Sequence, residues 1–165
     1  ALTAIAPTGT ISILASCSSG IEPVFSWVYR RTQLSGRKFT LVHPLFKAHF
    51  KSKLTETDYN WLLEHVYKYG TLQNVEKPEL VSEEEKRLFR SALDIDWKAH
   101  IDVQAAFQKH CHGGISKTIN MPHSAGKEDI KQALIYAWRH GLKGLTIYRT
   151  GSRQYVVLSL QKSQD

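Results

Sequence analysis

A short stretch near the start of the chain has the pattern of a strand, a tight turn and a helix. Residues Ala4–Ala15 read Ala-Ile-Ala-Pro-Thr-Gly-Thr-Ile-Ser-Ile-Leu-Ala. The apolar side chains of Leu2–Ala6 predict a buried parallel strand. Pro7 would end that strand, because proline has no N–H to give to a neighbouring strand. Later in the chain, a short strand at residues 116–120, a helix and a second strand at Leu145–Tyr148 favour an α/β fold.

The turn itself, Thr8 and Gly9, leads into a helix in which Thr10 and Ser12 place hydroxyls at the start. The first N–H groups of a helix lack partners within it and lie at the positive end of its dipole, so such a turn can bind an anion such as phosphate. An ordinary helix N-cap is the simpler interpretation of the local pattern, since the stretch is neither a Walker loop nor GxGxxG. We expect the apolar residues of the helix to be buried: Ile11, Ile13 and Leu14.

Length and charge limit the classes of protein to consider. The 165 residues suffice for one domain with a core, and the formal net charge of +7 favours anionic partners. We do not expect nucleic acid as a partner, because the basic residues are scattered and no nucleic-acid-binding motif accompanies them.

The two cysteines, Cys17 and Cys111, form no disulfide framework, which suits the cytoplasm. We expect both to be small buried residues. We do not expect His110-Cys111-His112 to bind a metal, because three consecutive residues cannot converge on one ion.

The first half of the chain predicts a hairpin and then a group of helices. Val24–Gln33 and Lys38–His43 are the strands of the hairpin, with a turn at Ser35-Gly36. A helical insert covers about residues 44–92. It contains a helix that begins at Pro44, a second from about Thr57 to Gly70, and a capping box of Ser82 and Glu85.

The second half predicts helices that alternate with extended segments. Asp96 or a neighbour caps a helix from Trp97 to about Cys111, and residues 116–120 form a short strand or an extended loop. The next helix carries an apolar stripe of Ile130, Ala133, Leu134, Ala137 and Trp138, and a buried strand follows at Leu145–Tyr148. We expect one domain over residues 1–153 and a tail over 154–165, which would add an edge strand or be frayed.

Four ordered blocks of this sequence resemble the large catalytic chain of ribonucleotide reductase, and the adenosylcobalamin-dependent class most closely. They begin with Ala4–Ser12 followed by Ser18–Pro23, and continue with Val103–Lys109, Ile115–Pro122, and Leu142–Arg149 followed by Gly151–Arg153. The resemblance implies the C-terminal part of a ten-stranded α/β barrel, with Leu2–Ala6 and Leu145–Tyr148 as its last two strands. Since the chain begins inside a strand and without Met, we expect a fragment of a longer protein.

The resemblance also implies a function for the turn. The family binds the substrate's phosphates there, which points to Thr8, Gly9, Thr10, Ile11 and Ser12. The whole enzyme would reduce ribonucleoside di- or triphosphates to deoxyribonucleotides by a radical route, with a thiol reductant such as thioredoxin. The family's radical cysteine lies in an Asn-x-Cys-x-Glu setting that neither Cys17 nor Cys111 matches. We therefore expect that cysteine in the remainder of the catalytic chain, and no reductase activity from the fragment alone.

The last strand bears on the source of the radical. The iron-dependent class carries two adjacent tyrosines there that relay an electron and a proton between subunits. Their equivalents here are Thr146 and Ile147, which are not easily oxidised, and Tyr148 stands alone. The resemblance therefore implies adenosylcobalamin as the cofactor. The alternative from a different class is a non-catalytic basic module that binds phosphate or nucleic acid.

Overall fold

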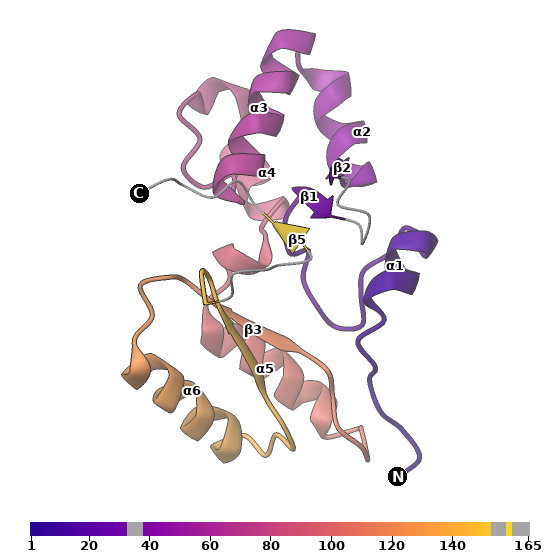
Figure 1. Ribbon diagram of the computed structural model, residues 1–165, viewed down its shortest axis with the longest axis vertical. Coiled ribbons are helices and arrows are strands. Elements are labelled where there is room, and N and C mark those ends of the chain that lie inside the picture. The colour runs from indigo at the N-terminus through magenta and orange to yellow at the C-terminus, as the bar shows by residue number, and fades with distance from the viewer. Residues whose placement is uncertain (33–37, 153–157, 160–165) are drawn as a thin grey trace. The chain divides into compact units, whose positions relative to one another are not determined.

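The computed structural model describes residues 1–32, 38–152 and 158–159, which form two compact units (Figure 1). We call the described parts of Ala1–Pro23 and Ile95–Gln154 the sheet unit, and those of Val24–Asp94 and Tyr155–Asp165 the hairpin unit. The prediction of a single domain over residues 1–153 stays a prediction. Within the described residues, no helix has both the length and the apolar character needed to cross a membrane.

The sheet unit is built around two parallel strands joined through a helix. Strands β3 (Thr118–Met121) and β4 (Thr146–Arg149) pair from Thr118 with Thr146 to Met121 with Arg149. Helix α6 (Lys127–Arg139) makes the connection between them, as parallel strands require. Helix α5 (Trp97–Gln108) packs against β3 and α6. The core of this unit lies between the helices and the strands and consists of Ile101, Ile119, Met121, Ala133 and Ala137.

The expected first strand is reduced to a single bridge. Ile5 pairs in parallel with Ile115, supported by hydrogen bonds from Ser116 N–H to Ile5 O (2.9 Å) and from Gly113 N–H to Thr3 O (2.7 Å). The rest of Leu2–Ala6 has no strand assignment, and Leu2 is 89% exposed. The prediction of a buried strand is therefore wrong for this chain. A buried parallel strand needs neighbours on both edges and both faces, and the described residues supply one edge only.

Apolar residues of two helices are also more exposed than predicted. In α1 (Gly9–Ala15), Ile11, Ile13 and Leu14 are exposed, and Ser12 is the buried residue. In α6, Ala133 and Ala137 are buried as predicted, but Leu134 and Trp138 are exposed. Helical periodicity shows that residues share a face, but it does not show whether anything in the described chain covers that face.

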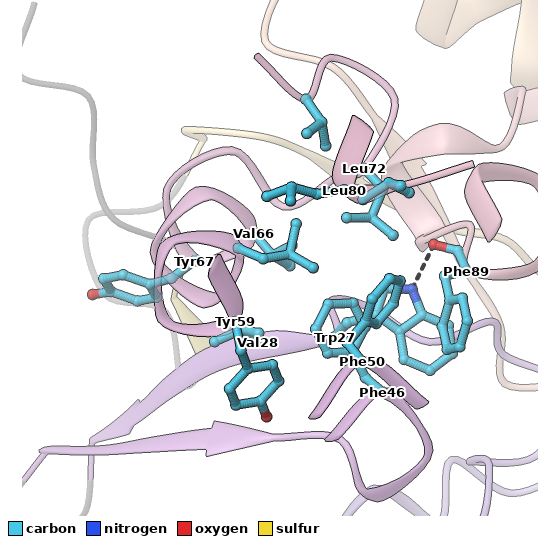
Figure 2. Packing of buried hydrophobic residues seen from close by; sticks show 13 residues of the cluster. Trp27, Val28, Phe46, Phe50, Tyr59, Val66, Tyr67, Leu72, Leu80 and Phe89 are labelled. Atoms are coloured by element: carbon cyan, nitrogen blue, oxygen red, sulfur yellow. Dashed lines mark hydrogen bonds between the residues drawn. The ribbon is translucent and has the colours of Figure 1, made fainter. Parts of the chain in front are cut away.

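The hairpin unit has an aromatic core between an antiparallel sheet and helices (Figure 2). Strands β1 (Val28–Thr32) and β2 (Lys38–Val42) form the predicted hairpin, whose turn lies outside the described residues. Strand β5 (Leu158–Ser159) pairs antiparallel with β1, so this part of the tail adds an edge strand. The rest of the tail, residues 154–157 and 160–165, lies outside the described residues. Trp27 and Phe89 meet edge to face, and the indole Nε1 of Trp27 donates to Phe89 O at 2.7 Å.

The helices of the hairpin unit begin where the local signals place them. Helix α2 (Pro44–Lys53) has proline at its first position, and α3 (Glu56–Tyr69) ends at Gly70, whose φ of 73° suits glycine. Helix α4 (Glu83–Leu88) has the predicted capping box of Ser82 and Glu85. Two 3₁₀ turns, Pro78–Leu80 and Ala92–Asp94, complete the unit.

Candidate functional site

The turn from Pro7 to Ser12 has the backbone geometry of an anion site. Thr8, the N-cap residue of α1, has φ of 49° and ψ of 23°, in the left-handed region. The first helical hydrogen bond runs from Ser12 N–H to Thr8 O (3.0 Å). The N–H groups of Gly9, Thr10 and Ile11 therefore precede the hydrogen-bonded part of the helix, and no acceptor meets them within the described chain. Three adjacent amides are thus free to donate to a ligand.

Gly9 leaves room for a ligand beside these amides. Apart from its two chain neighbours and the backbone of its own helix, a Cβ atom added to Gly9 would meet no described atom within 4 Å. Open space next to a glycine allows a ligand to approach the backbone closely, as it does in phosphate-binding loops. Helix α1 has only 7 residues. Because the helix is this short, the three free amides matter more than the helix dipole for any anion at the turn.

The side chains of the turn differ in how available they are. Thr10 is exposed, and its hydroxyl has no partner among the described residues. The Oγ of Ser12, which is buried, donates to Gly9 O at 2.8 Å, so its proton is already used. The Oγ1 of Thr8 lies 3.4 Å from the Oγ of Ser19. The sequence analysis predicted all three hydroxyls as phosphate ligands, whereas the structure leaves that of Thr10 the most available to donate to a ligand.

The turn lies at the end of the sheet where ligands bind in α/β proteins. Because Ile5 and Ile115 pair in parallel, the chain after Ile5 runs in the same direction as β3. The turn, the end of β3 and the end of β4 therefore lie toward the carboxyl ends of parallel segments, the usual location of binding sites in such folds. At the end of β4, Arg149 Nε donates to Ala125 O (2.9 Å) and Nη2 to His123 O (2.6 Å). Arg149 thus holds the loop after β3 and is not a free phosphate ligand.

A cluster of the titratable residues Lys117, His100 and Glu22 was not predicted. Lys117 and His100 are 2% and 1% exposed, and the Nζ of Lys117 lies 2.9 Å from Nδ1 of His100 and 3.2 Å from Oε2 of Glu22. Burial lowers the pKa of Lys117, and the Glu22 carboxylate acts in the opposite direction. Glu22 and Lys117 fall in two of the four blocks that resemble the reductase family, and this was the only indication in the sequence that they matter. Their contact could not be predicted, because they lie far apart in the sequence.

The cysteines and the last strand can also be compared with the predictions. Cys17 is exposed and Cys111 is half-buried, so the prediction that both are buried is wrong.

In β4, Ile147 packs against the core of the sheet unit, and Tyr148, the next residue, points to the opposite face of the strand. Ile147 and Tyr148 therefore do not share a face of the strand.

The chain was compared with known proteins. Residues 1–148 match the family model described as "Ribonucleotide reductase, barrel domain". A vitamin B12-dependent ribonucleoside-diphosphate reductase of Thermoplasma acidophilum is 42% identical over 157 residues, 95% of this chain and 20% of that protein. The enzyme with the same name in Mycobacterium tuberculosis (strain H37Rv) is 35% identical over 96% of this chain and 22% of that protein.

A solved structure shows the same fold. The class Id ribonucleotide reductase alpha subunit of Actinobacillus ureae matches with a TM-score of 0.68 and 25% identity, over 88% of this chain and 26% of that one. The chain thus spans about a fifth to a quarter of the length of these relatives. The expected fold class, part of the reductase's α/β barrel, is confirmed by the family model and this structure. From its sequence and its fold together, this chain belongs to the ribonucleotide reductase barrel-domain family.

Proposed function

We propose that this chain is the phosphate-binding portion of a vitamin B12-dependent ribonucleotide reductase. The observation that carries the proposal is the row of three free amides at Gly9, Thr10 and Ile11, at the carboxyl end of a parallel segment. The relatives that bear the B12-dependent name align with 95–96% of the chain, and the match to the barrel-domain model, residues 1–148, includes the turn. The complete enzyme would reduce ribonucleotides by a radical route in the cytoplasm and provide deoxyribonucleotides for DNA synthesis.

In this proposal the turn binds and orients the nucleotide. The amides of Gly9, Thr10 and Ile11 donate hydrogen bonds to oxygens of the substrate's phosphates, and the Thr10 hydroxyl adds a further donor. Hydrogen bonds to a charged acceptor are stronger than those between neutral groups. Thr8 and Ser12 hold the backbone of the turn through its first helical bond and the Ser12–Gly9 bond. A nucleotide fixed by its phosphates presents its ribose to the reacting groups in one orientation.

The radical chemistry is assigned to the remainder of the catalytic chain. Neither Cys17 nor Cys111 has the setting of the radical cysteine, and a thiol reductant such as thioredoxin would act on cysteines elsewhere. Adenosylcobalamin would supply the initial radical when bound. The described residues do not fit a corrin: the hollow of about 490 Å³ bounded by Pro44, Lys47, Ala48, Lys51 and Ser52 is open to solvent and would not enclose so large a ring. We derive no step through this cofactor.

The experiment is Thr10→Ala in the full-length enzyme, with substrate affinity measured at equilibrium. The loss of one charge-assisted hydrogen bond should weaken nucleotide binding by about ten- to a hundredfold, from roughly 1.5–3 kcal/mol. Thr10→Ser, which keeps the hydroxyl, is the matched control and should bind nearly as the wild type does. An unchanged nucleotide affinity in correctly folded Thr10→Ala would remove Thr10 from the site.

A further inference from the structure

The phosphate-binding turn has little support of its own. Thr8 is β-branched and holds a positive φ of 49°, a conformation that such residues rarely adopt. Its side chain makes no capping hydrogen bond to α1, and the apolar residues of that short helix are exposed. A backbone in a sparsely populated region persists only when its surroundings hold it there. Something outside the turn must therefore fix its shape.

The segment Ser19–Gly20 lies directly against the turn and the extended segment before it. The Oγ of Ser19 donates to Pro7 O and lies 3.4 Å from the Oγ1 of Thr8. Gly20 has a positive φ of 53°, and a Cβ added to it would lie 3.3 Å from Ala6 O. Ser19 thus touches both residues that precede α1. It is the described side chain outside α1 and its N-cap that is best placed to fix the turn.

Glu22 attaches this segment to the buried interior of the sheet unit. The Glu22 N–H donates to Ser19 O at 2.9 Å, so the two residues are joined by a short turn. One oxygen of the Glu22 carboxylate accepts from Thr118 N–H at 2.6 Å, and the other lies 3.2 Å from the Nζ of Lys117. Lys117 is almost fully buried, and a buried ammonium strongly favours a conformation that keeps its carboxylate partner. The contact between the end of the segment and the start of β3 is therefore firmly held.

We propose that Ser19, held in place by the ion pair of Glu22 with the buried Lys117, is a positioning residue for the phosphate-binding turn. The connection runs from the start of β3 through the Glu22 carboxylate to Ser19, and from Ser19 to Pro7 and Thr8. The inference rests on the proposed function of the turn. Ser19 itself does not touch the nucleotide; it keeps Thr8 in the conformation that aims the amides of Gly9, Thr10 and Ile11 at one point.

The test uses Ser19→Ala in the full-length enzyme and compares two ligands. We expect the affinity for a ribonucleoside diphosphate to fall by about three- to tenfold, the range for one neutral hydrogen bond. The affinity for the corresponding ribonucleoside, which has no phosphate, should not change. Ser19→Thr retains the hydroxyl and should restore nucleotide binding. Ser18→Ala removes a neighbouring exposed hydroxyl and serves as the matched control.

A second variant tests the anchor. Glu22→Gln keeps an oxygen for Thr118 N–H but removes the negative charge beside Lys117, so it should show the same selective loss of nucleotide affinity. Glu22→Asp, with a shorter reach, replaces it if Glu22→Gln does not fold. Nucleotide affinity equal to that of the wild type in the folded variant would overturn the role of the Glu22–Lys117 pair.

The outcomes separate this inference from the proposed function. If Thr10→Ala weakens nucleotide binding and Ser19→Ala does not, the turn binds phosphate but Ser19 does not position it. If Ser19→Ala lowers the affinities for nucleotide and nucleoside equally, its role is general and the inference is wrong. If neither Thr10→Ala nor Ser19→Ala affects nucleotide binding, the proposed function itself fails.

Discussion

The carboxylate of Glu85 has a strongly lowered pKa, and replacing this residue should destabilise the hairpin unit measurably. Its oxygens lie 2.6 Å from Nε2 of His49 and 2.7 Å from Nζ of Lys53, and they accept from the N–H and Oγ of Ser82. Burial raises the pKa of Glu85, but the hydrogen bonds from Lys53, His49 and Ser82 outweigh it and lower the pKa from 4.5 to about 2. The charged carboxylate therefore stabilises the folded state.

The size of the effect follows from that pKa. A fall from 4.5 to about 2 corresponds to at most about 3.4 kcal/mol, at about 1.36 kcal/mol for each pKa unit. The side chains of Lys53 and His49 are 42% and 41% exposed, so water and salt screen part of the interaction. We expect Glu85→Gln to cost about 2 kcal/mol. Glutamine at this position can still form a capping box with Ser82, so the loss reports the charge.

Hydrogen exchange measured by mass spectrometry on the full-length enzyme can resolve this effect. At pH 7, peptides covering α2 and α4 should lose about thirtyfold in protection, the equivalent of about 2 kcal/mol. Glu83→Gln is the matched control on the same helix, because the Glu83 side chain is 75% exposed in its pair with Lys86. That variant should change protection by less than about threefold.

The pH dependence gives an independent check. A depressed carboxyl pKa contributes its full stability above 4.5, and the contribution is lost as the pH falls from 4.5 toward 2. Glu85→Gln and the wild type should therefore converge in stability over that interval. Equal protection of Glu85→Gln and wild type at pH 7, or a difference that persists at pH 2, would refute the reasoning.

Two further predictions concern the hairpin unit. Burial lowers the pKa of His65, and the charge of Glu76 acts in the opposite direction. Since His65 binds a proton more readily in the unfolded chain than in the folded one, the stability should fall as the pH drops below 6.5. His65→Phe should remove this step from the urea midpoints measured by tryptophan fluorescence at pH 7.5 and 5.5; a step that remains in the variant would assign it to another group. Trp27→Phe leaves Phe89 O without the indole donor and should cost about 1–3 kcal/mol of unfolding free energy in urea titrations, whereas an unchanged midpoint would show that the carbonyl finds another partner.

Local signals in the sequence predicted most of the secondary structure. Pro44 at the start of α2, Gly70 at the end of α3 and the capping box of Ser82 and Glu85 act within a few residues, so they can be read without knowing the fold. The hairpin was predictable for the same reason, from two β-rich runs around a short turn. The turn at Thr8 and Gly9 was placed correctly at the start of α1.

Burial and long-range contacts were not predictable. Whether Ile11 is covered depends on elements that lie elsewhere in the barrel, and periodicity carries no information about them. The contact of Glu22 with Lys117 joins residues 95 positions apart, and neither residue type suggests it. The place of Ser12 in the sequence led to the prediction that its hydroxyl binds phosphate. That the hydroxyl instead donates to Gly9 O depends on the rotamer that the turn allows, which the sequence does not show.

The two ends of the segment from Val24 to Ala92 lie close together, which has a consequence for changes in its length. The N–H of Ala92 donates to Val24 O at 2.7 Å, so the segment between them leaves and returns at neighbouring points. The segment from Val24 to Ala92 therefore forms one long loop with closed ends, and strand β5 of the tail is added to it by pairing with β1. Loop closure costs grow only slowly with length, so such a loop can be lengthened, shortened or exchanged for another folded module while Pro23 and Ile95 keep their spacing. The segment between Val24 and Ala92 is therefore the part of this chain best suited to changes in length, provided that β1 keeps its pairing with β5.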